Sequence, residues 1–186
     1  VGGWRVDGFG MLGTESEEPQ QRYERTAAFI EILQSLWCAN KQPFNHSSEW
    51  YQISEGEASP VPEIAPVIAN AGSSSDGRDL TARLCDWAFV STPSIAALGE
   101  VLSDIQRRAS SHGRSLKTAI FLFVVMGASQ EAAEAALSDI IASKDDVATK
   151  NWLHDLTAGS GSFDTFTENM LASSGGGVHV IGPPEV

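Results

Sequence analysis

Apolar residues recur through the first third of the chain at the spacing of an amphipathic helix. Steps of three and four residues place five side chains on one helical face: Tyr23, Ala27, Ile30, Leu33 and Trp37. This periodicity predicts a helix over residues 22–37. Residues 1–21 and 38–65 lack a sustained period and carry many Gly, Pro and Ser residues, which favours loops, with a short strand at residues 50–53.

From Pro66 onward, apolar runs alternate with segments of helical spacing. We expect strands near residues 66–70, 86–90 and 117–126, and helices near residues 77–85, 93–111 and 130–143. The longest apolar run has no polar face, which is typical of a parallel strand that is covered on both sides. This order predicts an α/β fold, either a barrel or a doubly wound sheet.

The pattern weakens in the last quarter of the chain. Residues 144–177 predict a short helix around residues 151–153, followed by loops rich in Gly and Ser. Residues 178–186 predict a strand, a turn and the start of a helix.

The junction between the first predicted strand and its helix is built from small residues. Residues 69–78 read Ala-Asn-Ala-Gly-Ser-Ser-Ser-Asp-Gly-Arg. Small residues allow a ligand to approach the backbone, and the first N–H groups of a helix point at it with the positive end of the helix dipole behind them. A phosphate group suits such a turn, although the same spacing also fits an ordinary connection between strand and helix.

Composition and charge narrow the range of partners. The chain has 186 residues, 42% hydrophobic and 19% charged, which fits one domain over residues 1–186. Twelve basic residues against 24 acidic ones give a net charge of -12, which disfavours binding to nucleic acid or to an anionic membrane. The longest apolar run, residues 118–127, is too short to cross a bilayer.

The two cysteines indicate neither a metal site nor a disulfide framework. Cys38 and Cys85 lie far apart in the sequence and have no CxxC spacing, so we expect free thiols in a cytoplasmic protein and no bound metal. The sequence begins Val-Gly-Gly-Trp, with neither a secretory leader nor an initiating Met. We therefore expect the chain to be an internal part of a longer protein.

Taken in order, these segments resemble the bacterial-luciferase-like flavin-dependent monooxygenases, which include alkanesulfonate, dimethylsulfone and pyrimidine monooxygenases. The resemblance covers nearly the whole chain and is carried by residues 1–4, 22–25, 36–37, 44, 50–51, 60–62, 70–78, 86–90, 112–114 and 181–186. It implies a TIM (β/α)8 barrel, here incomplete because it lacks the first strands and the last unit, since a barrel takes about 250 residues.

The resemblance also implies a cofactor site for reduced FMN. Ser74 would donate its hydroxyl and backbone N–H to the FMN phosphate, while Gly72 and Ser73 would shape the turn. Arg22 and Tyr23 would reach the phosphate or the ribityl chain, because an Arg fork binds oxyanions. The alternatives are a solvated charge at a helix start for Arg22 and a core side chain for Tyr23.

The same resemblance implies a substrate pocket that involves Trp4, Phe121 and Phe123. In the alkanesulfonate branch the corresponding strand carries Arg and His, whereas this strand offers Phe121 and Phe123. A sulfonate would find no cation there, so we expect a small neutral substrate, similar to a sulfone or a pyrimidine. Barrel core is the alternative for both phenylalanines. A second departure is Gly8, where family members often carry an acidic residue.

The implied activity is insertion of one oxygen atom from O2 into the substrate, with FMNH2 supplied by a separate NAD(P)H-dependent flavin reductase. The flavin carries most of this chemistry, and the four histidines are scattered, so no catalytic residue is assigned. Two alternatives stay open: a deazaflavin (F420)-dependent oxidoreductase on the same scaffold, and a non-catalytic flavin-binding fragment. Self-association into a homo-oligomer also stays open.

Overall fold

A computed structural model describes residues 11, 13, 17–38, 42–92, 94–157 and 178–184. The chain divides into two compact units. Among the described residues, the first unit holds residues 17–88 and 105–117, and the second holds residues 11, 13, 89–104 and 118–184. The predicted single domain over residues 1–186 stays a prediction, and each unit is described by itself below.

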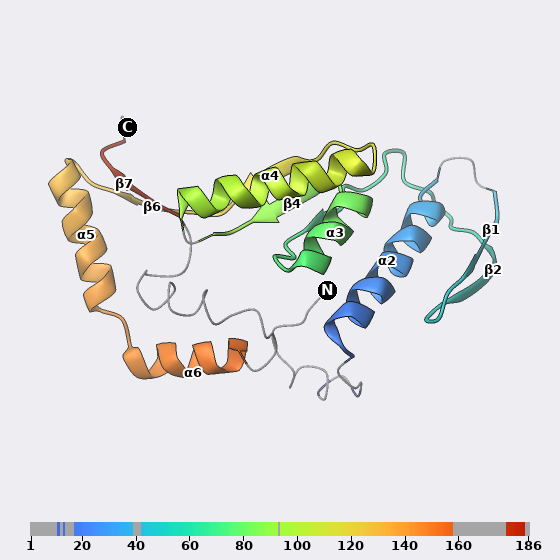
Figure 1. Ribbon diagram of the computed structural model, residues 1–186, viewed down its shortest axis with the longest axis horizontal. Coiled ribbons are helices and arrows are strands. Elements are labelled where there is room, and N and C mark those ends of the chain that lie inside the picture. Colours follow the sequence, from blue (N-terminus) through green and yellow to red (C-terminus); the bar gives the residue numbers. More distant parts are fainter. Residues whose placement is uncertain are drawn as a thin grey trace. The chain divides into compact units, whose positions relative to one another are not determined.

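The helices and strands alternate along most of the chain, as Figure 1 shows. In chain order they are α2 (Pro19–Leu36), β1 (Phe44–Ser47), β2 (Gln52–Gly56), β3 (Ala69–Asn70), α3 (Ser75–Leu84), β4 (Trp87–Val90), α4 (Ile95–Ser111), β5 (Lys117–Ile120), β6 (Leu122–Met126), α5 (Gln130–Ala142), α6 (Asp146–Thr157) and β7 (Val178–Gly182). The predicted α/β class is confirmed.

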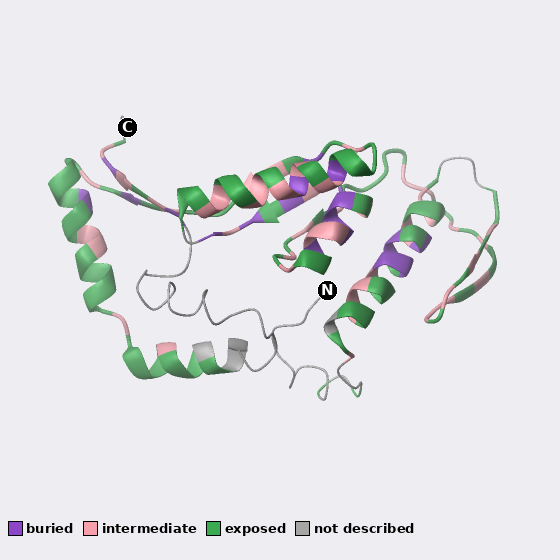
Figure 2. Cartoon of the chain, viewed as in Figure 1, coloured by how far each residue is buried: buried purple, intermediate pink, exposed green. Residues whose placement is uncertain are grey.

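The core of the first unit lies between α2 and α3. Its cluster of buried side chains is Ala27, Ile30, Leu80 and Cys85, with Tyr23, Ile68 and Leu84 packed against it. Buried positions accordingly fall along α2 and α3 in Figure 2. Burial of this apolar surface joins two helices that are far apart in the sequence.

The buried face of α2 differs in part from the predicted one. Ala27 and Ile30 are buried as expected, but Ala28 and Ile32 are buried as well. Trp37 is the C-cap residue and is half-buried. The helix therefore buries a broader stripe than one row of three and four residue steps describes.

A three-stranded sheet has β4 between β3 and β5. β3 and β4 are parallel, with Ala69 opposite Trp87. The carboxylate of Asp86 accepts a hydrogen bond from the Ile68 N–H at 3.0 Å, directly before β3. These bonds fix the direction in which the chain enters the small-residue turn.

The sequence prediction missed one strand pair. β1 and β2 form an antiparallel hairpin, where we expected a loop with one short strand at residues 50–53. The expected strand over residues 117–126 is divided into β5 and β6, which are separated by Phe121. The Phe121 N–H donates to the Val90 carbonyl at 2.9 Å.

In the second unit, β6 and β7 pair in parallel from Leu122 opposite Val178 to Met126 opposite Gly182. α5 packs against both strands. A side chain at Gly127, just after β6, would collide with the Ala133 backbone N, so this glycine permits the close contact with α5.

The expected helix around residues 151–153 lies within α6. The described strands form three separate sheets and no closed barrel. Among the described residues, no helix is both long and apolar enough to cross a membrane.

We predict that only one of the two thiols reacts in the folded chain. Cys85 is fully buried, and this burial, together with the nearby Asp86 carboxylate, raises the pKa of its thiol to about 11. Its reactive thiolate is therefore scarce at pH 8, whereas Cys38 is exposed. Iodoacetamide at pH 8 should label Cys38 alone, as read by peptide mass spectrometry, and label both thiols in denaturant. Equal labelling of both cysteines in the native chain would contradict the burial of Cys85.

Candidate functional site

The small-residue turn connects β3 to α3, as the sequence predicts. Ser74 is the N-cap residue of α3, and its hydroxyl oxygen accepts a hydrogen bond from the Gly77 N–H at 3.1 Å. The Ser74 carbonyl accepts from the Arg78 N–H at 2.9 Å. The turn thus begins the helix in the standard way, with a serine that satisfies one of the first N–H groups.

Two glycines bring the turn and the helix into direct backbone contact. A Cβ atom on Gly72 would lie 2.8 Å from the Gly77 Cα, and a Cβ atom on Gly77 would lie 2.8 Å from the Gly72 Cα and from the Tyr23 Oη. Any side chain at either position would occupy space that the backbone and Tyr23 now fill. The approach therefore requires glycine at both positions.

A half-buried amide and a buried hydroxyl hold this contact in place. The Asn70 Nδ2 donates to the Thr81 Oγ1 at 2.8 Å and to the Gly77 carbonyl at 3.2 Å. The Thr81 hydroxyl donates to the same carbonyl at 2.7 Å. Thr81 is fully buried, so these bonds also satisfy groups that would otherwise be costly to bury.

Tyr23 joins the turn from α2. The Ser74 hydroxyl donates to the Tyr23 Oη at 3.1 Å, across 51 residues of sequence. Since Ser74 uses its only proton on Tyr23, the phenol O–H of Tyr23 can serve a further acceptor. Tyr23 also packs against the core cluster, so the two roles that the sequence left as alternatives are combined in one side chain.

The other predicted site residues are less closely tied to this turn. Ser73 is exposed within it, and Arg22 is half-buried in the first turn of α2, next to Tyr23. Phe121 and Phe123 belong to the second unit, where the Phe123 ring lies 5.4 Å from the His179 ring. Trp4 and Gly8 lie outside the described residues. The assignments of Arg22, Ser73, Trp4, Phe121 and Phe123 stay predictions.

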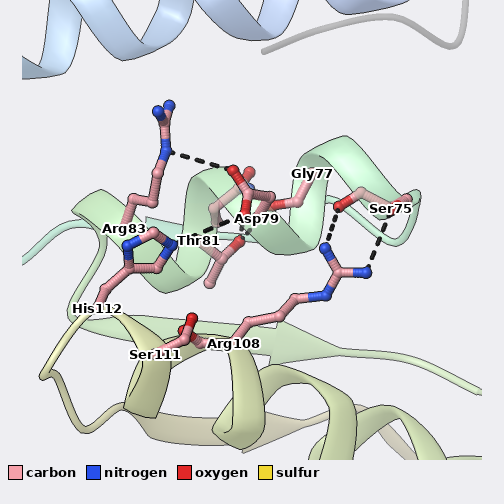
Figure 3. Close-up of polar contacts among 9 residues, drawn as sticks. Ser75, Gly77, Asp79, Thr81, Arg83, Arg108, Ser111 and His112 are labelled. Carbon is pink, nitrogen blue, oxygen red and sulfur yellow. Dashed lines mark hydrogen bonds and ion pairs between the residues drawn. The ribbon is translucent and has the colours of Figure 1, made fainter.

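Charged side chains line α3 where α4 runs beside it, as Figure 3 shows. Asp76 lies in the first turn of α3, and Arg108 of α4 donates to the Ser75 carbonyl and hydroxyl. Farther along, Asp79 pairs with Arg83 at 3.3 Å and with His112 at 3.8 Å. Asp76 and Arg108 thus place one carboxylate and one guanidinium at the first turn of α3, and the sequence predicted no role for either residue.

Two hollows, of about 500 and 450 Å³, lie in the first unit at the C-terminal end of α2. Cys38 and Gln42 line both, and Ser74 lines neither. Among the described residues, no three His, Cys, Asp or Glu side chains come together as a metal site would require. The small-residue turn is therefore not part of either hollow, and its hydrogen-bond donors are what make it a candidate site.

Comparison with known sequences relates the chain to one family. Residues 2–185 match the family described as luciferase-like monooxygenase. The chain is 28% identical to the FMNH2-dependent dimethylsulfone monooxygenase of Pseudomonas putida, over 99% of this chain and 53% of that protein. It is 28% identical to the pyrimidine monooxygenase RutA of Acinetobacter baylyi, over 82% of this chain and 42% of that protein. The chain spans about half the length of the curated relatives it matches.

Solved structures share the fold at lower sequence identity. A riboflavin lyase with modified FMN and riboflavin aligns with a TM-score of 0.78 and 20% identity, over 98% of this chain and 52% of that one. A long-chain alkane monooxygenase aligns with a TM-score of 0.76 and 18% identity, over 96% of this chain and 49% of that one. An F420-dependent secondary alcohol dehydrogenase aligns less well, with a TM-score of 0.53 and 15% identity over 66% of this chain and 38% of that one.

We predict that the contact between the two glycines is essential to the first unit. Gly77→Ala should lower the free energy of unfolding by about 1–3 kcal/mol, because the added methyl group collides with Gly72 and Tyr23. Gly99→Ala in α4 is the matched control, since a Cβ atom there meets nothing within 4 Å. Alanine should stabilise that helix position by about 0.5–1 kcal/mol. Urea unfolding would measure both, and equal midpoints for Gly77→Ala and the parent chain would contradict the close approach.

Proposed function

This chain belongs to the luciferase-like monooxygenase family, and we propose that its small-residue turn binds the phosphate of FMN in a flavin-dependent monooxygenase. The relatives named above supply the class of reaction, and the turn supplies the chemistry of binding. Because the chain spans about half of those relatives, the activity of the whole protein is part of this proposal.

One observation carries the proposal: the pairing of Ser74 with Tyr23 at the N-terminus of α3. Two hydroxyl groups from distant parts of the sequence meet where the first N–H groups of a helix point outward. The oxygen atoms of a phosphate accept hydrogen bonds from hydroxyls and from free N–H groups, and the helix dipole favours the negative charge of the phosphate.

The shape of the turn also fits a phosphate group. The contact between Gly72 and Gly77 fixes the path of the turn beside the first residues of α3, where N–H groups lack an acceptor within the helix. Tyr23 is held by the core cluster, which fixes its hydroxyl beside Ser74. In our proposal the Ser74 backbone N–H and the Tyr23 hydroxyl donate to the phosphate, and the Ser74 hydroxyl orients Tyr23. Gly72 and Ser73 shape the turn, and Arg22 adds a positive charge from α2.

The substrate is proposed to be small and neutral. Reduced FMN, when bound, would supply the electrons that activate O2, and a separate NAD(P)H-dependent reductase would supply the reduced flavin. The protein's own task is then to bind, to orient and to exclude water. Phe121, Phe123 and Trp4 are proposed to line an apolar pocket, which would suit a sulfone or a pyrimidine better than a sulfonate.

We also propose that the strands are parts of one incomplete (β/α)8 barrel. The likeness to the alkane monooxygenase and the riboflavin lyase supports a luciferase-like fold. The strands β3, β4 and β6 are each followed by a helix, which is the repeating unit of such a barrel, and the pairs β3–β4 and β6–β7 are parallel, as its strands are.

We predict that Ser74→Ala weakens FMN binding by about 1–3 kcal/mol, because Tyr23 loses the hydroxyl that orients its own charge-assisted hydrogen bond to the phosphate. The matched control is Ser129→Ala, since Ser129 caps α5 in the same way, accepting from the Ala132 N–H at 3.3 Å. Loss of either cap should cost about 1 kcal/mol of stability. Titration of flavin fluorescence should show weaker binding for Ser74→Ala alone. Unchanged FMN affinity in Ser74→Ala would remove Ser74 from the site.

We further predict turnover that depends on both reduced FMN and O2. With an added flavin reductase and NADH, the full chain should oxygenate dimethylsulfone or uracil and leave an alkanesulfonate unchanged, since the proposed pocket offers no cation to a sulfonate. Product analysis with ¹⁸O2 would measure the incorporated atom. Hydride transfer with F420 in the absence of O2 would favour the deazaflavin alternative, and FMN binding without any turnover would favour a non-catalytic fragment.

A further inference from the structure

We infer that Arg108 is a positioning residue for the phosphate-binding turn, an inference that rests on the proposed function. Arg108 lies in the C-terminal half of α4, within the first unit, and its side chain reaches the first residue of α3 (Figure 3). Its Nη1 donates to the Ser75 carbonyl at 3.4 Å, and its Nη2 donates to the Ser75 hydroxyl at 3.2 Å. Ser75 directly follows Ser74, the N-cap residue.

The hydrogen bond from Arg108 to the Ser75 carbonyl also fixes the direction of the Asp76 N–H. This carbonyl and the Asp76 N–H belong to one planar trans peptide unit, so they point in opposite directions. Because the carbonyl points along α3, the Asp76 N–H points out of the N-terminus, where no carbonyl of the helix can accept from it. A guanidinium that holds the carbonyl therefore also holds the direction of an N–H group that a phosphate would accept.

The two nitrogens Nη1 and Nη2 of the guanidinium bond to two different acceptors on Ser75. A planar fork that spans a carbonyl and a hydroxyl resists rotation of the Ser75 backbone and side chain together. Lysine has its three N–H donors on a single rotatable nitrogen, so it would hold the two acceptors less rigidly. The arrangement thus ties the first turn of α3 to α4, while Ser74 and Tyr23 tie it to α2.

Charge adds to this effect. Asp76 places a carboxylate in the first turn of α3, which opposes the approach of a phosphate dianion. The guanidinium of Arg108 adds a positive charge at the neighbouring residue, Ser75. Arg108 thus offsets part of the repulsion without itself being a ligand of the phosphate.

Arg108→Ala in the full chain tests this role when FMN and riboflavin are compared, because the two differ only in the phosphate. The parent chain should bind FMN more tightly than riboflavin. Arg108→Ala should lower FMN affinity about tenfold, the loss of one charge-assisted interaction, and leave riboflavin affinity unchanged. Arg108→Lys, which keeps the charge but loses the fork, should show a smaller loss, about threefold.

Arg114→Ala is the matched control, since Arg114 donates to the Cys85 carbonyl at 2.8 Å at the opposite end of α3. It should retain the preference for FMN. Three outcomes would overturn the positioning role and leave the proposed function in place. Arg108→Ala could keep the parent chain's preference for FMN over riboflavin, or it could lose affinity for both ligands equally. Arg108→Lys could keep the full preference for FMN. A parent chain that binds FMN and riboflavin equally would instead remove the proposed function, and this inference with it.

Discussion

The direct contact between the backbones of Gly72 and Gly77 is the constraint on which the candidate site depends. With a Cβ atom at either position, the turn before α3 would have to move away from the helix, since the clash is with backbone atoms and not with a flexible side chain. The Asn70 amide, the Thr81 hydroxyl and the Ser74 cap all bond across this short distance. Close approach therefore comes first, and the hydrogen bonds that define the turn follow from it.

The same contact links the site to the stability of the first unit. Tyr23 packs on the cluster of Ala27, Ile30, Leu80 and Cys85 and also touches Ser74 through its hydroxyl. Burial of apolar side chains between α2 and α3 thus sets the position of a polar group. A site held by two packed helices needs little reordering when an anion arrives, which lowers the entropic cost of binding.

Local pattern predicted most of the fold, and contacts across the sequence account for what it missed. The expected helices at residues 77–85, 93–111 and 130–143 correspond to α3, α4 and α5, because caps and apolar spacing are local signals. The strand β1 and its pairing with β2 were missed, since neither strand has a fully buried position and β2 does not alternate regularly between half-buried and exposed positions. The turn that carries Ser74 was predicted to precede a helix over residues 77–85, but neither the capping of α3 by Ser74 nor its bond to Tyr23 was predicted. No spacing rule indicates a pair that lies 51 residues apart, and the same holds for Arg108 and Ser75.

The net charge of -12 and an anionic ligand are compatible because electrostatic effects are local. At physiological ionic strength the screening length is about 8 Å, so acidic side chains farther away contribute little at the turn. The N-terminus of α3, the Asp76 carboxylate and the Arg108 guanidinium contribute to the local balance of charge at the turn. Arg108 counters Asp76, and the helix dipole then favours an anion. A strongly acidic chain can in this way hold a phosphate, provided that its few cations are placed by the fold beside the N–H groups that bind it.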